Sequence, residues 1–136
     1  MTTIKQSATT YLHKKVLICG SRSVTALPDE VCKTLDKIIA FQVNILIGDA
    51  DGVDRLVQKY LHSKRYRKVT VYYAKSGLRS NIGKWTSIRV AGNYIDRDKL
   101  MCDKANWCVA VHKGNSRGTK RNIESFKPEA VKVFIL

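Results

Sequence analysis

The sequence predicts a Rossmann-like α/β fold, a three-layer sandwich of about five parallel strands in the order 3-2-1-4-5. Short apolar runs alternate with segments of helical periodicity along the chain, which is typical of βαβ units. Three of the apolar runs also end directly in a turn rich in glycine, serine or aspartate. Right-handed crossovers between such strands place helices on both faces of a parallel sheet.

The first half of the chain supplies three of the expected strands. Residues 16–20 form a continuous apolar run, as expected of a buried strand. A helix is expected from Pro28 and Asp29, because Val31, Leu35 and Ile38 recur at helical spacing. Residues 44–48 are the second strand, a second helix follows residue 52, and residues 69–74 are the third strand.

The second half begins with a long connection, residues 75–93, that has little periodicity. A connection of this length is typical of a lid or a binding loop, and disorder is the alternative. A helix over residues 94–104, a strand over 106–112, a helix over 117–126 and a closing strand over 131–135 complete the pattern. We expect residues 1–14 to form a loose arm and residues 15–136 to form a single domain.

The charge balance indicates the kind of partner. The chain of 136 residues carries 25 Lys and Arg against 11 Asp and Glu, a formal net charge of +14. This favours an anionic partner such as a nucleotide, a nucleic acid or a lipid headgroup, and a merely soluble basic surface is the alternative. No apolar run approaches the ~20 residues of a membrane span, and no apolar signal sequence begins the chain. We expect a soluble cytoplasmic protein with no membrane partner, as a monomer or a homodimer.

The four cysteines do not have the spacing of a metal site. No CxxC pair is present, and the three histidines are not placed to complete a zinc site. Cys19 and Cys108 lie within strand patterns, where a thiol behaves as a small apolar side chain. We expect free thiols, no metal ion and no organic cofactor.

The first turn, GSRS, follows the first strand. Gly20 allows a close approach of the backbone to a ligand, Ser21 offers a hydroxyl group, and Arg22 offers a planar fork for a phosphate or carboxylate. An ordinary turn is the alternative interpretation. In the expected strand order this turn and the GNSRGT turn lie at the switch point of the sheet, where ligands bind in such folds.

The second turn, GDADGVD, gathers acidic residues in an otherwise basic chain. Gly48 and Gly52 loosen the backbone, and Asp49, Asp51 and Asp54 could accept hydrogen bonds from ribose hydroxyls or a base edge, or hold a divalent ion. The alternative is that these carboxylates cap the following helix.

The third motif combines RDKLM with the GNSRGT turn. Arg97 and Met101 lie one helical turn apart. The turn opens a helix and can cradle a phosphate, because the first N–H groups of a helix have no acceptor within it. The residues expected to bind there are Gly114, Ser116, Arg117, Gly118 and Thr119.

Together GSRS, GDADGVDRL and IDRDKLM followed by ANWCVAVHKGNSRGT resemble the SLOG superfamily. That group includes Lonely-guy-type nucleotide phosphoribohydrolases, the Rossmann-like core of DNA-processing protein A, and small stand-alone domains that bind nucleotide-derived ligands. The resemblance covers residues 16–136 and implies a nucleotide or nucleotide-sugar ligand, such as AMP, ADP-ribose or NAD.

The resemblance to the phosphoribohydrolases is incomplete. It assigns Arg97 and Met101 to the family's arginine and methionine, and it matches Gly114, Gly118 and Thr119 to part of the PGGxGTxxE loop. Asn122 stands where the family has its glutamate, and Glu124 is the nearest acid on that helix. Arg97 and Glu124 are therefore the candidate catalytic residues of an alternative function, N-glycosidic cleavage of a nucleoside 5′-monophosphate.

A second alternative is binding of single-stranded nucleic acid. Aromatic residues interleaved with cations can stack on bases. The residues that suggest this interface are Lys64, Arg65, Tyr66, Arg67, Lys68, Lys84, Trp85 and Arg89.

Overall fold

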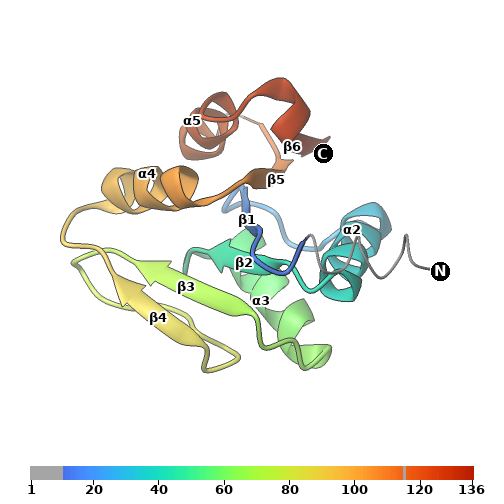
Figure 1. Cartoon of the computed structure of the whole chain (residues 1–136). Coiled ribbons are helices and arrows are strands. Elements are labelled where there is room, and N and C mark those ends of the chain that lie inside the picture. Colours follow the sequence, from blue (N-terminus) through green and yellow to red (C-terminus); the bar gives the residue numbers. More distant parts are fainter. Residues whose placement is uncertain (1–10, 115) are drawn as a thin grey trace.

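The computed structural model describes residues 11–114 and 116–136. Its six strands form one parallel sheet in the order β4-β3-β2-β1-β5-β6 (Figure 1). The strands are β1 (Lys15–Gly20), β2 (Asn44–Ile47), β3 (Val69–Tyr73), β4 (Thr86–Arg89), β5 (Trp107–His112) and β6 (Val131–Ile135). The connecting helices are α2 (Asp29–Ala40), α3 (Val53–Ser63), α4 (Tyr94–Lys104) and α5 (Arg117–Glu124), and a 3-10 turn, η1 (Pro128–Ala130), precedes β6.

The order expected for five strands is confirmed. The sheet has six strands, one more than expected. The additional strand, β4, lies within the long connection over residues 75–93 and pairs with β3 at the edge of the sheet. Its sequence, TSIR, contains a single large apolar residue, and three of its four residues are exposed. An edge strand with so little buried surface has no apolar run by which it could be recognised.

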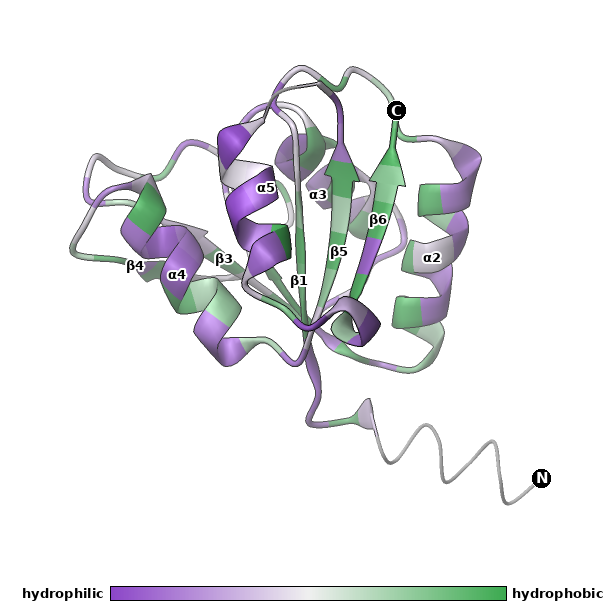
Figure 2. Cartoon of the chain, turned by 90° about the horizontal axis from the view of Figure 1, so that it is seen from above, coloured by the Kyte–Doolittle hydropathy of each residue, from purple (hydrophilic) through white to green (hydrophobic). Residues whose placement is uncertain are grey.

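The helices cover the sheet on both faces (Figure 1). Val16 and Ile18 of β1 belong to the core cluster beneath α2 and α3, whereas Leu17 belongs to the cluster beneath α4 and α5. Figure 2 shows the apolar strands between flanking helices whose outer surfaces are polar. The continuous apolar run of β1 is therefore explained by burial on both faces.

The loops after β1 and β5 diverge. The loop after β1 leads to α2 on one face, and the loop after β5 leads to α5 on the other face. Because β1 and β5 are neighbours in the sheet, this divergence opens a crevice at their carboxyl ends.

The expected arm, residues 1–14, falls mainly outside the described residues. At its end, the Tyr11 ring packs edge-on against Phe41 and Trp107, with ring centroids 5.3 Å apart in both pairs. Among the helices of the described chain, none is long and apolar enough to cross a membrane.

Candidate functional site

A pocket of about 310 Å³ lies in the crevice at the carboxyl ends of the strands. The first turns after β1 and β2, the loop before β4, and helices α4 and α5 all contribute to its walls. Five arginines line it, Arg22, Arg79, Arg97, Arg117 and Arg121, together with two carboxylates, Asp54 and Asp98. A polar pocket of this size and charge suits a small anionic ligand.

Asp49 organises the floor of the site. It follows β2 and is 1% exposed. Its Oδ1 accepts hydrogen bonds from Nη1 of Arg97 and Nη2 of Arg79, both at 2.9 Å, and its Oδ2 accepts one from the backbone N–H of Arg79 at 2.8 Å. Because Asp49 is buried, accepts these three hydrogen bonds and does not line the pocket, it fixes two arginines and does not itself face a ligand.

Arg97 is also held by the residue that follows it. Its Nε and Nη2 donate to Oδ1 of Asp98 at 3.1 and 2.9 Å. The other carboxylate oxygen, Oδ2, accepts a hydrogen bond from Nδ2 of Asn122 at 3.4 Å. Arg97, which is 7% exposed, therefore lies between two carboxylates in a fixed orientation.

Asp54 is the most buried carboxyl group that lines the pocket, at 6% exposed. Its Oδ2 accepts a hydrogen bond from the backbone N–H of Ala50 at 3.1 Å. Burial raises the pKa of Asp54 from 3.8 to about 6, and the opposing effects of the Arg97 charge and the Ala50 hydrogen bond only partly offset this. The group therefore changes protonation state close to neutral pH.

The loop between β3 and β4 is ordered and delivers Arg79 to the pocket. Gln58, fully buried on α3, donates to the carbonyl oxygens of Gly48 and Ser80 at 3.0 and 3.2 Å. Its Oε1 accepts from the N–H of Ile82 at 3.0 Å. These bonds and those to Asp49 attach the loop to the end of β2, so the interpretation of this segment as disordered is wrong.

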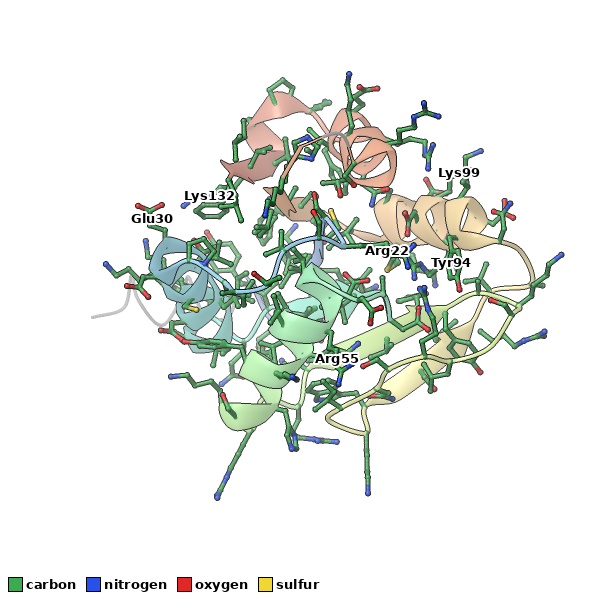
Figure 3. All side chains as sticks on the ribbon, turned by 180° about the vertical axis from the view of Figure 1, so that it is seen from behind. Arg22, Glu30, Arg55, Tyr94, Lys99 and Lys132 are labelled. Carbon is green, nitrogen blue, oxygen red and sulfur yellow. The ribbon has the colours of Figure 1, made fainter. Side chains whose placement is uncertain are left out.

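Tyr94, at the start of α4, places an aromatic ring in the wall of the pocket. The Arg79 guanidinium carbon lies 4.2 Å from the ring centroid and that of Arg97 lies 5.1 Å from it. Figure 3 shows Tyr94 and Arg22 on the same side of the molecule, close to α4, and both line the pocket. Tyr94 is 38% exposed and lines the pocket, so a planar ligand group has access to it.

The first turn of α5 forms the opposite wall. Ser116 is the N-cap, and its Oγ accepts a hydrogen bond from the Thr119 N–H at 3.4 Å. A Cβ atom added at Gly118 would have no atom nearer than 4.0 Å, so the space above this glycine is open. Three arginines, Arg22, Arg117 and Arg121, are exposed around this turn, and among the described residues none of them forms an ion pair with a carboxylate.

Two glycines allow the acidic loop to pack closely. Gly52 has φ 77°, and a Cβ there would meet Cα and the carbonyl oxygen of Arg22 at 2.5 Å. At Gly48 a Cβ would meet Oδ2 of Asp54 at 2.6 Å and Cζ of Arg97 at 2.9 Å. A side chain at either position would displace groups that line the pocket.

The structure brings together most of the site residues expected from the sequence. Those that line the pocket are Gly20, Arg22, Gly48, Asp54, Arg97, Met101, Ser116, Arg117, Gly118 and Thr119. Those that do not line it are Ser21, Asp49, Asp51, Gly52, Gly114 and Glu124.

The expected site residues that do not line the pocket form other contacts or are exposed to solvent. The Ser21 hydroxyl donates to the carbonyl oxygen of Lys113 at 3.1 Å and accepts from its N–H at 2.8 Å, which joins the ends of β1 and β5. Asp51 and Glu124 are exposed, so Glu124 does not take the place of the glutamate that the resemblance calls for. Gly114, at φ 67°, has open space around it.

Sequence reasoning missed four polar residues of the pocket. Asp98 and Arg121 could have been found from spacing: Asp98 follows Arg97 in the quoted motif, and Arg121 lies one turn after Arg117 on α5. Arg79 and Tyr94 had no such signal. Arg79 reaches the site because buried Asp49 and Gln58 hold the loop before β4 in place, and Tyr94 lies there as the first residue of α4.

The cysteines are free thiols in the described structure. Cys19 and Cys108 are buried in neighbouring strands with their sulfur atoms 3.8 Å apart. The hydrogen bond with the neighbouring Cys108 thiol and burial together hold the pKa of Cys19 well above its usual range, which makes it a poor nucleophile. No cluster of three or more potential metal ligands occurs among the described residues.

The aromatic residues of the expected nucleic-acid interface are buried. Tyr66 and Trp85 are 8% and 4% exposed. The Tyr66 hydroxyl donates to the carbonyl oxygen of Val43 at 2.6 Å, and Nε1 of Trp85 donates to that of Tyr66 at 2.8 Å. These rings therefore support the fold and are not available to stack on bases.

Comparison with known proteins finds no family model that matches this chain and no curated protein with significant sequence similarity. The Rossmann-like parallel sheet is established by the strand topology. Membership of the SLOG superfamily stays a prediction from the motifs.

Proposed function

We propose that the pocket binds a phosphate-bearing nucleotide or nucleotide-sugar, such as AMP, ADP-ribose or NAD, and that the protein acts as a sensor or a weak processing enzyme. The observation that carries this proposal is a group of three arginines around the first turn of α5, Arg22, Arg117 and Arg121, which form no ion pair with a carboxylate of the described residues. Guanidinium groups and a helix N-terminus both favour a phosphate group.

Other groups that line the pocket suit the rest of a nucleotide. The carboxylates of Asp54 and Asp98 can accept hydrogen bonds from ribose hydroxyl groups. The Tyr94 ring and the Arg79 guanidinium offer flat surfaces on which a base can stack. In this arrangement the phosphate lies at α5 and the sugar lies between α4 and the acidic loop.

The motifs that resemble the SLOG superfamily support the same ligand class. Three of them, in the same order along the chain, lie at or beside this pocket. We therefore propose that the chain is a small stand-alone member of that superfamily.

Calorimetric titration tests this proposal. AMP and ADP-ribose should bind the protein, whereas adenosine, which carries no phosphate, should bind at least about tenfold more weakly because it lacks the charge-assisted hydrogen bonds. Equal binding of AMP and adenosine, or no binding of any nucleotide at millimolar concentration, would contradict it.

A second candidate function, hydrolysis of the N-glycosidic bond, is favoured by the pairing of Asp98 with Asn122. Asn122 stands where the resemblance calls for a glutamate, and its amide donates to a carboxylate oxygen of Asp98. The Asp98 carboxylate, on α4, thus lies beside the position of the missing glutamate. This carboxylate could stabilise positive charge that develops on the sugar during cleavage. Asp54, with its raised pKa, is the candidate general acid.

Chromatography of AMP after incubation with the protein separates binding from cleavage. If the protein only binds the nucleotide, AMP is recovered intact. Release of adenine that is lost in Asp54→Asn and Asp98→Asn but retained in Glu124→Gln would establish the hydrolase instead.

A further inference from the structure

The two edges of the sheet present different surfaces. At one edge, β4 exposes Thr86, Ser87 and Arg89, which are polar. At the other edge, β6 exposes Val133 and Ile135, with 37% and 79% of their surface accessible. A polar edge discourages pairing with another strand, whereas an apolar edge strand offers a template for it.

The backbone of β6 is free to pair on its outer side. The N–H of Leu136 donates to the carbonyl oxygen of His112 at 2.9 Å, so even-numbered residues of β6 direct their backbone groups towards β5. The N–H and C=O groups of Val131, Val133 and Ile135 therefore point away from β5. Within the described chain, β5 is the one strand paired with β6.

We propose that two copies of this chain associate through β6, with the strands antiparallel and a two-fold axis at Val133 perpendicular to the sheet. This register pairs Val133 with Val133 of the second copy and Val131 with Ile135. The sheet then continues through both copies, and the exposed apolar side chains of one β6 cover those of the other.

The side chains of β6 disfavour one competing register and are compatible with this one. With a two-fold axis perpendicular to the sheet, residues that pair directly must have side chains on the same face. The axis therefore passes through a residue, and moving the axis by one residue changes the pairing by two residues. The register centred on Lys132 would place two ammonium groups opposite each other, which is unfavourable. The register centred on Val133 instead places Lys132 opposite Phe134, and Lys132 already lies with its Nζ 5.1 Å from the ring centroid of its own Phe134.

The dimer should be weak and sensitive to salt. One pair of five-residue strands buries less than the ~1,200 Å² typical of a stable interface. Each copy also carries a formal charge of +14, so the copies repel each other, and added salt screens this repulsion. Salt should therefore strengthen this association, although it should weaken the binding of an anionic ligand at the pocket.

Analytical ultracentrifugation provides the first test. The parent protein should pass from monomer to dimer between about 10 μM and about 1 mM, a range that corresponds to weak association. Val133→Lys, which places two charges at the two-fold axis, should remain monomeric throughout. The matched control is Leu78→Lys, because Leu78 is a comparably exposed apolar residue on the loop before β4. A monomeric parent, or a Val133→Lys variant that dimerises like the parent, overturns the proposal.

Disulfide trapping tests the register. Directly opposed residues that exchange backbone hydrogen bonds have Cα atoms about 5.5 Å apart, within the range that a disulfide spans. Val133→Cys should therefore form a disulfide-linked dimer on mild oxidation. Lys132→Cys should not form such a disulfide, since the Cα atoms of residue 132 in the two copies would be about 8 Å apart in this register. Cross-linking of Lys132→Cys but not Val133→Cys, measured against the oxidised parent, overturns the proposed register.

Discussion

Asp49 and Arg97 form a buried ion pair at the end of β2, with Oδ1 of the aspartate 2.9 Å from Nη1 of the arginine. The same oxygen also accepts a hydrogen bond from Arg79, so one carboxylate fixes two arginines that come from different parts of the chain. This arrangement sets the shape of the pocket before any ligand binds, and preorganisation of this kind lowers the entropic cost of binding.

Removal of the Asp49 carboxylate should destabilise the fold. In Asp49→Ala, Arg79 loses its carboxylate and Arg97 retains only Asp98. Loss of one partner of a buried pair costs about 3–5 kcal/mol, and we expect the lower end of that range because Asp98 remains. Urea unfolding measures this change. The control is Asp51→Ala, an exposed carboxylate two residues further along, which should change stability by less than about 0.5 kcal/mol. Equal unfolding midpoints for Asp49→Ala and the parent would show that the pair does not support the fold.

The raised pKa of Asp54 makes stability depend on pH. The unfolded chain releases this proton near pH 3.8, whereas the folded protein retains it to about pH 6. Over that interval the unfolded state binds fewer protons, so the free energy of unfolding falls as the pH rises. The stability of the parent relative to Asp54→Asn should therefore decrease by up to about 3 kcal/mol between pH 4 and pH 7. A difference that stays constant over this range would mean that the carboxyl group titrates normally in the folded protein.

The arginines at α5 should determine affinity and its salt dependence. Arg117→Gln combined with Arg121→Gln should weaken AMP binding about tenfold or more, because two charge-assisted contacts to the phosphate are lost. The matched control, Arg55→Gln with Lys59→Gln, removes the same charge from exposed positions on α3 and should have little effect. If both double variants weaken binding equally, the net charge of the protein, and not this site, attracts the ligand. Binding of single-stranded DNA that is unaffected by Arg117→Gln with Arg121→Gln would favour the nucleic-acid alternative elsewhere on the surface.

The sequence was sufficient to predict the layers of the fold and the position of the crevice. Apolar runs such as residues 16–20 identified buried strands, and the turns that follow them marked the carboxyl ends of the sheet. The edge strand β4 could not be predicted, because three of its four residues are exposed and TSIR contains a single large apolar residue.

The roles of the aspartates needed the three-dimensional structure. Asp49, Asp51 and Asp54 lie within six residues, and the sequence alone made all three candidates for ligand binding, with capping of the following helix as the alternative. In the fold Asp49 is buried against arginines, Asp51 is exposed, and Asp54 lines the pocket. Arg79 reaches the site from a loop whose path depends on Gln58, so local sequence patterns contain no information about it.

The central proposal is that a phosphate-bearing nucleotide occupies the pocket above Gly118. Calorimetric titration of AMP into Gly118→Leu tests it directly, because the new side chain would extend into open space, where the nearest side-chain atoms, Nη2 of Arg121 and Oδ2 of Asp98, lie 4.0 Å from its Cβ. Leucine also favours a helix by about 0.8 kcal/mol relative to glycine, so the variant should fold at least as well as the parent. Lys120→Leu, an exposed position on the same helix, is the control. The parent and Lys120→Leu should bind AMP, whereas folded Gly118→Leu should not; unchanged binding by Gly118→Leu would contradict the proposed site.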